Sequence, residues 1–189
     1  MATAYSVAEL VEDLRRLRAS GADERETLKQ VRPLAERVAQ SKDAWLRKDH
    51  YEADPQQGFG VHLLHEELDH SLAVFALAWL PDRGTPPHDH GTWAVVAGVD
   101  GVEKNEFFER TDDRSKAGHA ELKRTAGKSF HVGEVLAMPA GTIHSVWNET
   151  QATTVSLHIY GRHINHTARS QFDLEKQAET PYLVKVAGQ

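Results

Sequence analysis

The sequence contains no cysteine, no long apolar run and no concentration of positive charge. Without cysteine the chain can form no disulfide, and any metal site must use nitrogen and oxygen ligands. No apolar run reaches the roughly 20 residues of a membrane-spanning helix, and the first residues lack a signal-peptide pattern, so we expect a cytoplasmic protein. The net charge of −6, with no run of four basic residues, argues against nucleic-acid and anionic-membrane partners.

Histidine is unusually frequent, with 12 residues in a chain of 189, and the composition is otherwise ordinary for a globular domain. The length is sufficient for one domain with a substantial core. There is no low-complexity segment and no clear internal repeat. We therefore expect residues 1–189 to form a single domain, and the sequence leaves its oligomeric state open.

The first fifty residues show helical patterning. Ser6 and Glu9 form a capping box ahead of an apolar stripe at helical spacing, and Gly21 can end this helix. A second helix is predicted over about 24–46, in which Pro33 marks a kink or a late start. Residues 1–50 are therefore expected to form a helical cap.

From about residue 59 the pattern changes to short apolar or alternating runs separated by turn residues. About ten strands at this spacing are typical of a sandwich or jelly-roll barrel, so the fold is predicted to be mainly β, with a barrel over 59–189. Residues 109–118 are charged, contain no apolar stretch and are predicted to form a solvated loop. The predicted strands cover residues 61–65, 72–80, 93–99, 102–108, 120–124, 129–132, 135–139, 143–147, 153–160 and 182–186.

Two short histidine motifs about fifty residues apart carry the strongest chemical signal. His88 and His90 follow a glycine and two prolines, and alternate residues of a strand point to the same face, so their imidazoles can converge on one ion. His144 follows a Pro-Ala-Gly turn and can approach from a neighbouring strand as a third ligand. Three imidazoles suit Fe, Zn, Ni or Cu and leave coordination positions open. The alternative interpretation is that these are surface histidines of ordinary strands.

The second histidine motif resembles the second motif of the cupin superfamily, which it matches at every position: Gly133, Pro139, Gly141, His144 and Asn148. The first cupin motif is matched at His88, His90 and Gly101. This resemblance implies a cupin jelly-roll barrel that binds a metal. It leaves open a cupin that has lost its metal and serves as a binding or storage module.

The first motif departs from the cupin pattern in two places. The family's leading glycine falls on Asp82, and its glutamate ligand falls on Ala94 or Val95, neither of which can bind a metal. Three neutral histidines leave a divalent ion with its full charge. Such a centre favours an anionic ligand such as a thiolate, and it has room for dioxygen beside that ligand.

A row of polar residues, Ser156, His158 and Tyr160, occupies alternate positions of the predicted strand 153–160, so all three face the same side. If they face inward, the row is costly unless its members are hydrogen-bonded to one another. Serine and histidine would then orient the phenol toward the metal. The alternative is the outward polar face of an edge strand, and the spacing does not decide between the two.

Taken together, residues 88–93 and this row resemble the bacterial thiol dioxygenases of the cysteine dioxygenase family, closest to the 3-mercaptopropionate dioxygenase branch, from about Trp45 to the C-terminus. The resemblance implies Fe(2+) held by the three motif histidines, an outer-sphere role for the row, and addition of both atoms of O2 to a thiol sulfur to give a sulfinic acid. The cysteine–tyrosine crosslink of mammalian-type members is impossible in this chain.

A small thiol acid needs a cation for its carboxylate, and arginine offers a bidentate fork. Mammalian-type enzymes take this arginine from a strand before the histidine pair, where the present chain offers only His62. In the 3-mercaptopropionate branch the arginine follows the tyrosine, and Arg169 stands nine residues after Tyr160. The resemblance therefore favours Arg169 as the carboxylate clamp, with Arg162 as the nearer rival and His62 as a further candidate.

The function predicted from the sequence is thus an Fe(2+) dioxygenase whose partners are a small thiol acid and O2. The position of the arginine favours 3-mercaptopropionate, with cysteine and mercaptosuccinate as alternatives. A second hypothesis is a zinc or nickel cupin that acts as an isomerase or hydrolase and turns over without dioxygen. A third is a non-catalytic cupin that binds a small ligand.

Overall fold

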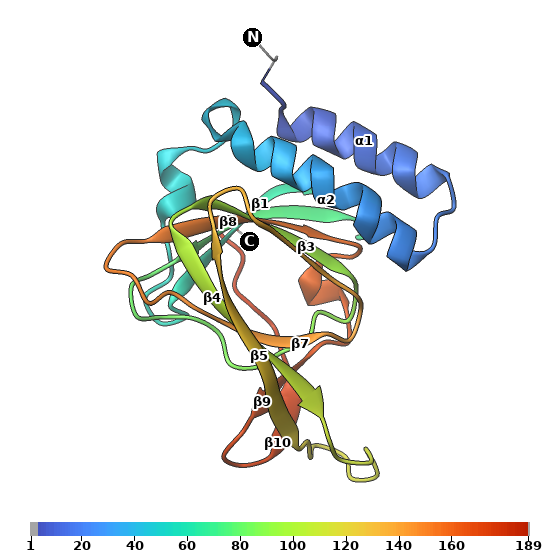
Figure 1. Ribbon diagram of the computed structural model, residues 1–189, viewed down its shortest axis with the longest axis vertical. Coiled ribbons are helices and arrows are strands. Elements are labelled where there is room, and N and C mark those ends of the chain that lie inside the picture. Colours follow the sequence, from blue (N-terminus) through green and yellow to red (C-terminus); the bar gives the residue numbers. More distant parts are fainter. Residues whose placement is uncertain (1–3, 189) are drawn as a thin grey trace.

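The computed structural model describes residues 4–188, in which two helices lie across one face of a β-barrel (Figure 1). None of the helices within these residues is long and apolar enough to cross a bilayer. The helices are α1, Val7–Ala19, and α2, Glu24–Gln40, with short 3-10 helices at Lys42–Ala44, Lys48–Tyr51 and Ile164–His166. The strands are β1, Phe59–Glu66; β2, Ala73–Trp79; β3, Ala94–Asp100; β4, Val102–Arg110; β5, Leu122–His131; β6, Val135–Met138; β7, Ile143–Trp147; β8, Thr154–Tyr160; β9, Ser170–Asp173; and β10, Ala178–Pro181.

Two antiparallel sheets enclose the interior of the barrel. The larger sheet has the strand order β1-β2-β8-β3-β6, and the smaller has the order β5-β4-β7. The β9–β10 hairpin lies beside the far end of the β4–β5 hairpin, where Arg110 and Glu179 form an ion pair of 2.7 Å (Figure 1). Two antiparallel sheets that face each other across a common interior form a jelly roll. The prediction of a mainly β jelly-roll barrel is confirmed.

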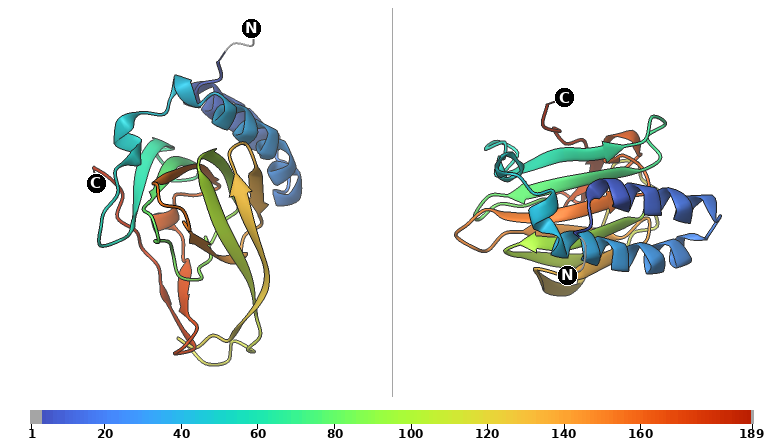
Figure 2. Two further views of the ribbon diagram at one scale, coloured as in Figure 1. Left: turned by 60° about the vertical axis from the view of Figure 1, so that its left-hand side comes forward. Right: turned by 90° about the horizontal axis from the view of Figure 1, so that it is seen from above.

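The helices at the N-terminus cap the larger sheet. The predicted capping box is present, because the Glu9 N–H donates to Ser6 Oγ at 3.2 Å and the Ser6 N–H donates to Glu9 Oε2 at 2.8 Å. Gly21 follows the helix with a φ of +71°. Both helices run side by side over the sheet (Figure 2), and their apolar stripes form one buried cluster with the outward side chains of β2, β3 and β8. The predicted helical cap is confirmed.

Several boundaries differ from the prediction. Helix α2 ends at Gln40 instead of residue 46, because Ser41 leaves the helical conformation and a 3-10 turn follows, while Pro33 is accommodated inside the helix. Residues 120–124 and 129–132 were predicted as two strands, but β5 runs through both; most of its side chains are exposed, so no apolar pattern marks it. Strand β4 continues to Arg110, inside the predicted loop. Residues 182–186 form no strand, and the β9–β10 hairpin before them was missed.

Strand β8 separates the helical cap from the barrel interior. It lies between β2 and β3 in the middle of the larger sheet, so the polar row is not on an edge strand. Val155, Leu157 and Ile159 pack in the cluster that contains the helices. The alternate residues, which include the buried Tyr160, therefore face the interior. This alternation places the whole polar row inside the barrel.

Candidate metal centre and its surroundings

Three histidines come together inside the barrel. His88, His90 and His144 each offer a ring nitrogen, and these nitrogens lie within 4.8 Å of one another. The three residues are only 5%, 2% and 1% exposed, respectively. No aspartate or glutamate within residues 4–188 joins the group, and Ala94 and Val95, at the place of the cupin glutamate, are buried apolar residues. The group can hold one metal ion through nitrogen donors alone.

Backbone pairing with β7 brings the first histidine motif to the second. The His88 N–H donates to the His144 carbonyl at 2.8 Å, and the His144 N–H donates to the His88 carbonyl at 3.0 Å. Beyond this bridge, His88 and His90 belong to no strand, so the strand predicted for them is wrong. The predicted convergence of their rings nevertheless occurs, with 5.1 Å between the two ring centres.

Hydrogen bonds at Nδ1 fix the ring orientations of His88 and His144. His88 Nδ1 lies 2.9 Å from the Pro86 carbonyl, and His144 Nδ1 lies 2.8 Å from Asn105 Oδ1. Both partners are acceptors, so each Nδ1 carries the proton and each Nε2 presents a lone pair to the group. The Nε2 atoms of His144 and His90 are 3.3 Å apart. Two nitrogen ligands, each about 2.1 Å from one ion, lie at about this separation, so the donors fit a shared metal.

Burial also sets the charge of these imidazoles. It is the main cause that lowers the pKa of His88, His90 and His144, and the positive charge of Arg169 lowers it further. The pKa of His144 falls to about 3. The histidines are therefore neutral near pH 7, which is the form that binds a transition metal. Three neutral imidazoles suit Fe, Zn, Ni or Cu.

Asn105, which the sequence did not single out, orients His144 from β4 and is only 3% exposed. We expect Asn105→Leu to weaken metal binding about 10- to 100-fold, because partners that orient a ligating histidine have effects of this size. Competition with a chromogenic chelator measures the affinity. Glu106→Gln, on the same strand but paired with Arg124 at 3.0 Å near the surface, is the matched control. An unchanged metal affinity in the Asn105 variant would show that the Asn105 amide does not orient the His144 ring for metal binding.

The polar row of β8 forms a hydrogen-bonded relay that ends at the histidines. Ser156 Oγ lies 2.8 Å from His158 Nε2, and His158 Nδ1 lies 2.8 Å from the Tyr160 hydroxyl. The Trp79 N–H donates to Ser156 Oγ at 3.0 Å. The Tyr160 ring centre is 5.2 Å from that of His90. We call the chain Ser156–His158–Tyr160 the relay.

Burial inside the barrel fixes the protonation states of the relay near pH 7. Burial lowers the pKa of His158 to about 3 and raises the pKa of Tyr160 well above its usual range. Near pH 7 the imidazole is therefore neutral and the phenol is protonated. A neutral imidazole has one N–H and one lone pair, so His158 donates at one end of the relay and accepts at the other.

Arg169 is a buried cation beside the histidines, with an exposed fraction of 4%. Its Nε donates to the Tyr182 carbonyl at 2.9 Å, and its guanidinium lies 4.3 Å from the centre of the Tyr182 ring, which is itself 5.3 Å from the ring of His88. No carboxylate within residues 4–188 forms an ion pair with it. Asp89 acts on it from a longer distance and accepts backbone N–H groups instead.

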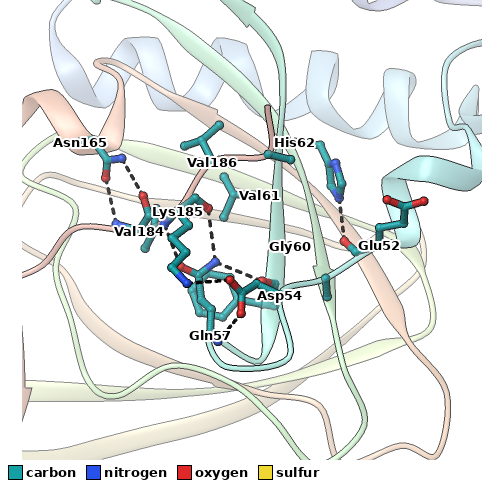
Figure 3. Close-up of a pocket in the computed structure, with 13 residues that line it drawn as sticks. Glu52, Asp54, Gln57, Gly60, Val61, His62, Asn165, Val184, Lys185 and Val186 are labelled. Carbon is teal, nitrogen blue, oxygen red and sulfur yellow. Dashed lines mark hydrogen bonds and ion pairs between the residues drawn. The ribbon is translucent and has the colours of Figure 1, made fainter. Parts of the chain in front are cut away.

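The other two candidate clamps lie elsewhere. Arg162 is exposed and donates to the His166 carbonyl at 2.8 Å. His62 lines a surface pocket of about 550 Å³, between β1 and the C-terminal segment, and its Nε2 is 2.8 Å from the Glu52 carbonyl (Figure 3). Of the three candidates, only Arg169 is brought to the buried histidines. Tyr182, which holds it there, was expected only to begin a strand, and no local sequence signal marks it.

No protein-family model matches the chain. Among solved structures, it is similar to oxalate oxidase in complex with glycolate (15% identity, 59% of this chain and 56% of that chain, TM-score 0.45). It is also similar to the DMSP lyase of Ruegeria pomeroyi (16% identity, 62% and 53%, TM-score 0.45) and to a cupin domain of a transcriptional regulator from Enterobacter cloacae (12% identity, 55% and 96%, TM-score 0.39). The chain thus spans little more than half the length of the first two. With TM-scores below 0.5, these similarities carry no argument about activity.

Proposed function

We propose that the chain is an iron(II)-dependent thiol dioxygenase that converts a small thiol acid, most of all 3-mercaptopropionate, and O2 to the sulfinic acid. One observation carries the proposal: within residues 4–188, three buried neutral imidazoles without a carboxylate lie beside a buried arginine without an anionic partner. A divalent ion held by neutral ligands keeps its full charge and favours a thiolate. The arginine can bind a carboxylate. A ligand that matches both features therefore carries a thiolate and a carboxylate, as a thiol acid does.

Arg169 is suited to bind the carboxylate of this substrate. A buried guanidinium without a counter-charge is unfavourable, and an incoming carboxylate relieves that cost through charge-assisted hydrogen bonds. The contacts with Tyr182 hold the arginine in one orientation, so little conformational freedom is lost on binding. Tyr182 packs against the Arg169 guanidinium and lies 5.3 Å from the ring of His88, so a thiol acid of a few carbons would reach from the clamp to the histidines.

Iron(II) held by the three histidines would supply the redox chemistry between the thiolate and dioxygen. In the overall reaction, RSH + O2 → RSO2H, two S–O bonds form and the O–O bond breaks. The sulfur supplies all four electrons, so no external reductant is needed. The protein's own residues position the reactants: Arg169 fixes the carboxylate, the buried site excludes bulk water, and Tyr160 holds a proton beside the histidines.

The phenol of Tyr160 gives a test of the relay. We expect Tyr160→Phe to keep its metal and its KM for the thiol acid but to lose about fivefold in kcat, because one neutral hydrogen bond contributes about 1 kcal/mol. Steady-state oxygen uptake and metal analysis measure these quantities. Tyr51→Phe, whose hydroxyl donates to Asp100 at 2.6 Å outside the site, is the control. An unchanged kcat in Tyr160→Phe would remove the phenol from the reaction.

An oxygen-electrode screen tests the proposed function and separates it from its alternatives. Iron-loaded protein is incubated with 3-mercaptopropionate, cysteine and mercaptosuccinate, with and without air. The proposal predicts oxygen uptake, fastest with 3-mercaptopropionate, and no turnover without air. Turnover without oxygen would favour a zinc or nickel isomerase or hydrolase. Tight binding of the thiol with no product would favour a binding module, and no uptake with any of the three thiols would reject the proposal.

A further inference from the structure

A buried carboxyl group lies behind the relay. Glu103 on β4 is 5% exposed, and its Oε1 has no hydrogen-bond partner among residues 4–188. A buried polar atom without a partner is costly, so its presence needs a physical reason. The side chains of Ser156 and Trp79 lie next to this carboxyl and lower its pKa, against the larger effect of burial. Glu103 therefore adjoins the end of the relay that is remote from the histidines.

Among the described residues, no positively charged group acts on the Glu103 carboxyl. Next to it on β4, Lys104 pairs with Glu149 at 2.6 Å, and Asn105 is bonded to His144. From β2 the carboxyl faces Trp79. The titratable groups of β8 on its side are His158, which is neutral, and Tyr160, whose pKa Glu103 helps to raise. On β5 the residue opposite Glu103 is the apolar Phe130, so the polar side chains that act on the carboxyl are Ser156 of the relay and Trp79.

The number of protons at Ser156 limits what the relay can do. The hydroxyl has one proton and two lone pairs, and the Trp79 N–H occupies one lone pair because indole is only a donor. His158, 2.8 Å away, takes either the remaining proton or the remaining lone pair, and Glu103 is the neighbouring group that can take the other. Whichever of them takes the proton, the other must use the lone pair. The direction of every later hydrogen bond follows from this choice.

We propose that Glu103 is a positioning residue whose protonation state sets the direction of the relay, and with it whether Tyr160 donates its proton to His158 or toward the three histidines. As a carboxylate, Glu103 accepts from Ser156, which then accepts from His158 Nε2, so that Nδ1 accepts the phenol proton. As a neutral acid, Glu103 donates to Ser156, which then donates to Nε2. His158 Nδ1 now donates to the phenol oxygen, and the phenol proton is free to point into the site.

The carboxyl is placed to change state under ordinary conditions. Burial raises the pKa of Glu103 to about 7, against the opposing effect of Ser156 and Trp79. Below this pH the neutral acid predominates and Tyr160 donates toward the histidines. Above it the carboxylate predominates and the phenol proton is bonded to His158. The effect on turnover rests on the proposed function, whereas the direction of the relay does not.

The tautomer of His158 tests the inference without any turnover. Nitrogen NMR of the full chain loaded with Zn²⁺, a diamagnetic ion, distinguishes Nδ1–H from Nε2–H, and the His158→Gln spectrum assigns the signals. In the wild type we expect the proton to move from Nδ1 to Nε2 as the pH rises through about 7. In Glu103→Leu, His158 is the acceptor that remains for Ser156 among the described residues, so Nδ1–H should persist on both sides of this pH. Glu103→Gln, which cannot ionise, should also show one tautomer throughout, and the exposed-strand control Glu106→Gln should switch as the wild type does.

A wild type with one tautomer throughout, or a switch that survives in both Glu103 variants, would overturn the inference. With iron-loaded protein and 3-mercaptopropionate, kcat of the wild type should fall about tenfold per pH unit above the midpoint, and this decline should be absent from Glu103→Leu. The two proposals fail separately. A tautomer switch without oxygen uptake would reject only the dioxygenase, and oxygen uptake without a switch would reject only the role of Glu103.

Discussion

Replacing His144 by alanine is expected to abolish iron binding and, with it, oxygen uptake. The variant removes one of three donors from a group that, among residues 4–188, includes no carboxylate to replace it. The loss in metal affinity should exceed the roughly 100-fold that loss of an orienting partner can cause. Metal analysis after gel filtration measures the iron bound per chain, and oxygen uptake measures activity.

The matched control for this variant is His62→Ala, because His62 is a histidine of the same barrel that lies at the surface pocket of Figure 3. It should retain one iron per chain and full activity. Circular dichroism shows whether both variants keep the fold. One tightly bound iron in His144→Ala would mean that the metal is held elsewhere, and the account of the site would be wrong.

Replacing Arg169 by alanine is expected to raise the KM for 3-mercaptopropionate about 100- to 1000-fold. The arginine is buried and its partner is the substrate, and losing one member of such a desolvated charged pair costs about 3–4 kcal/mol. If clamping also sets the geometry of the thiolate, kcat falls as well. Initial rates over a wide range of thiol concentration separate the two effects.

Two controls make the arginine test specific. Arg162→Ala removes an exposed arginine seven residues earlier in the chain and should leave KM unchanged. 3-Mercaptopropanol, which lacks the carboxylate, should be a poor substrate of the wild type. Its kcat/KM should fall little further in Arg169→Ala. An equal loss with both thiols would assign the effect of the variant to the fold and not to the carboxylate.

The sequence predicted that the three histidines come together, and the second motif could show this because it records local constraints. His144 follows a turn in which Gly141 has a φ of +84°, and such backbone favours glycine, so the spacing of the motif is tied to the structure. His88 and His90 were predicted to converge as strand neighbours. They converge because the backbone of His88 pairs with His144, a long-range contact that the strand argument did not contain.

The sequence could not show whether the polar row and the clamp are buried. Spacing placed Ser156, His158 and Tyr160 on one face, but only the position of β8 between β2 and β3 shows that this face is the interior. Arg169 and Arg162 have the same chemistry, and their difference arises from Tyr182, which packs on one of them. Glu103 stands in an ordinary charged stretch, and only the place of β4 in the barrel wall accounts for the burial of its side chain.

The fate of dioxygen tests the proposed chemistry most directly. Iron-loaded protein is supplied with 3-mercaptopropionate under 18O2 in ordinary water. The mass of the product is determined by mass spectrometry while oxygen uptake is followed. We expect one O2 consumed per thiol and a sulfinate that carries two labelled oxygen atoms. A product with oxygen from water, or a disulfide formed without incorporation, would contradict the assignment as a thiol dioxygenase.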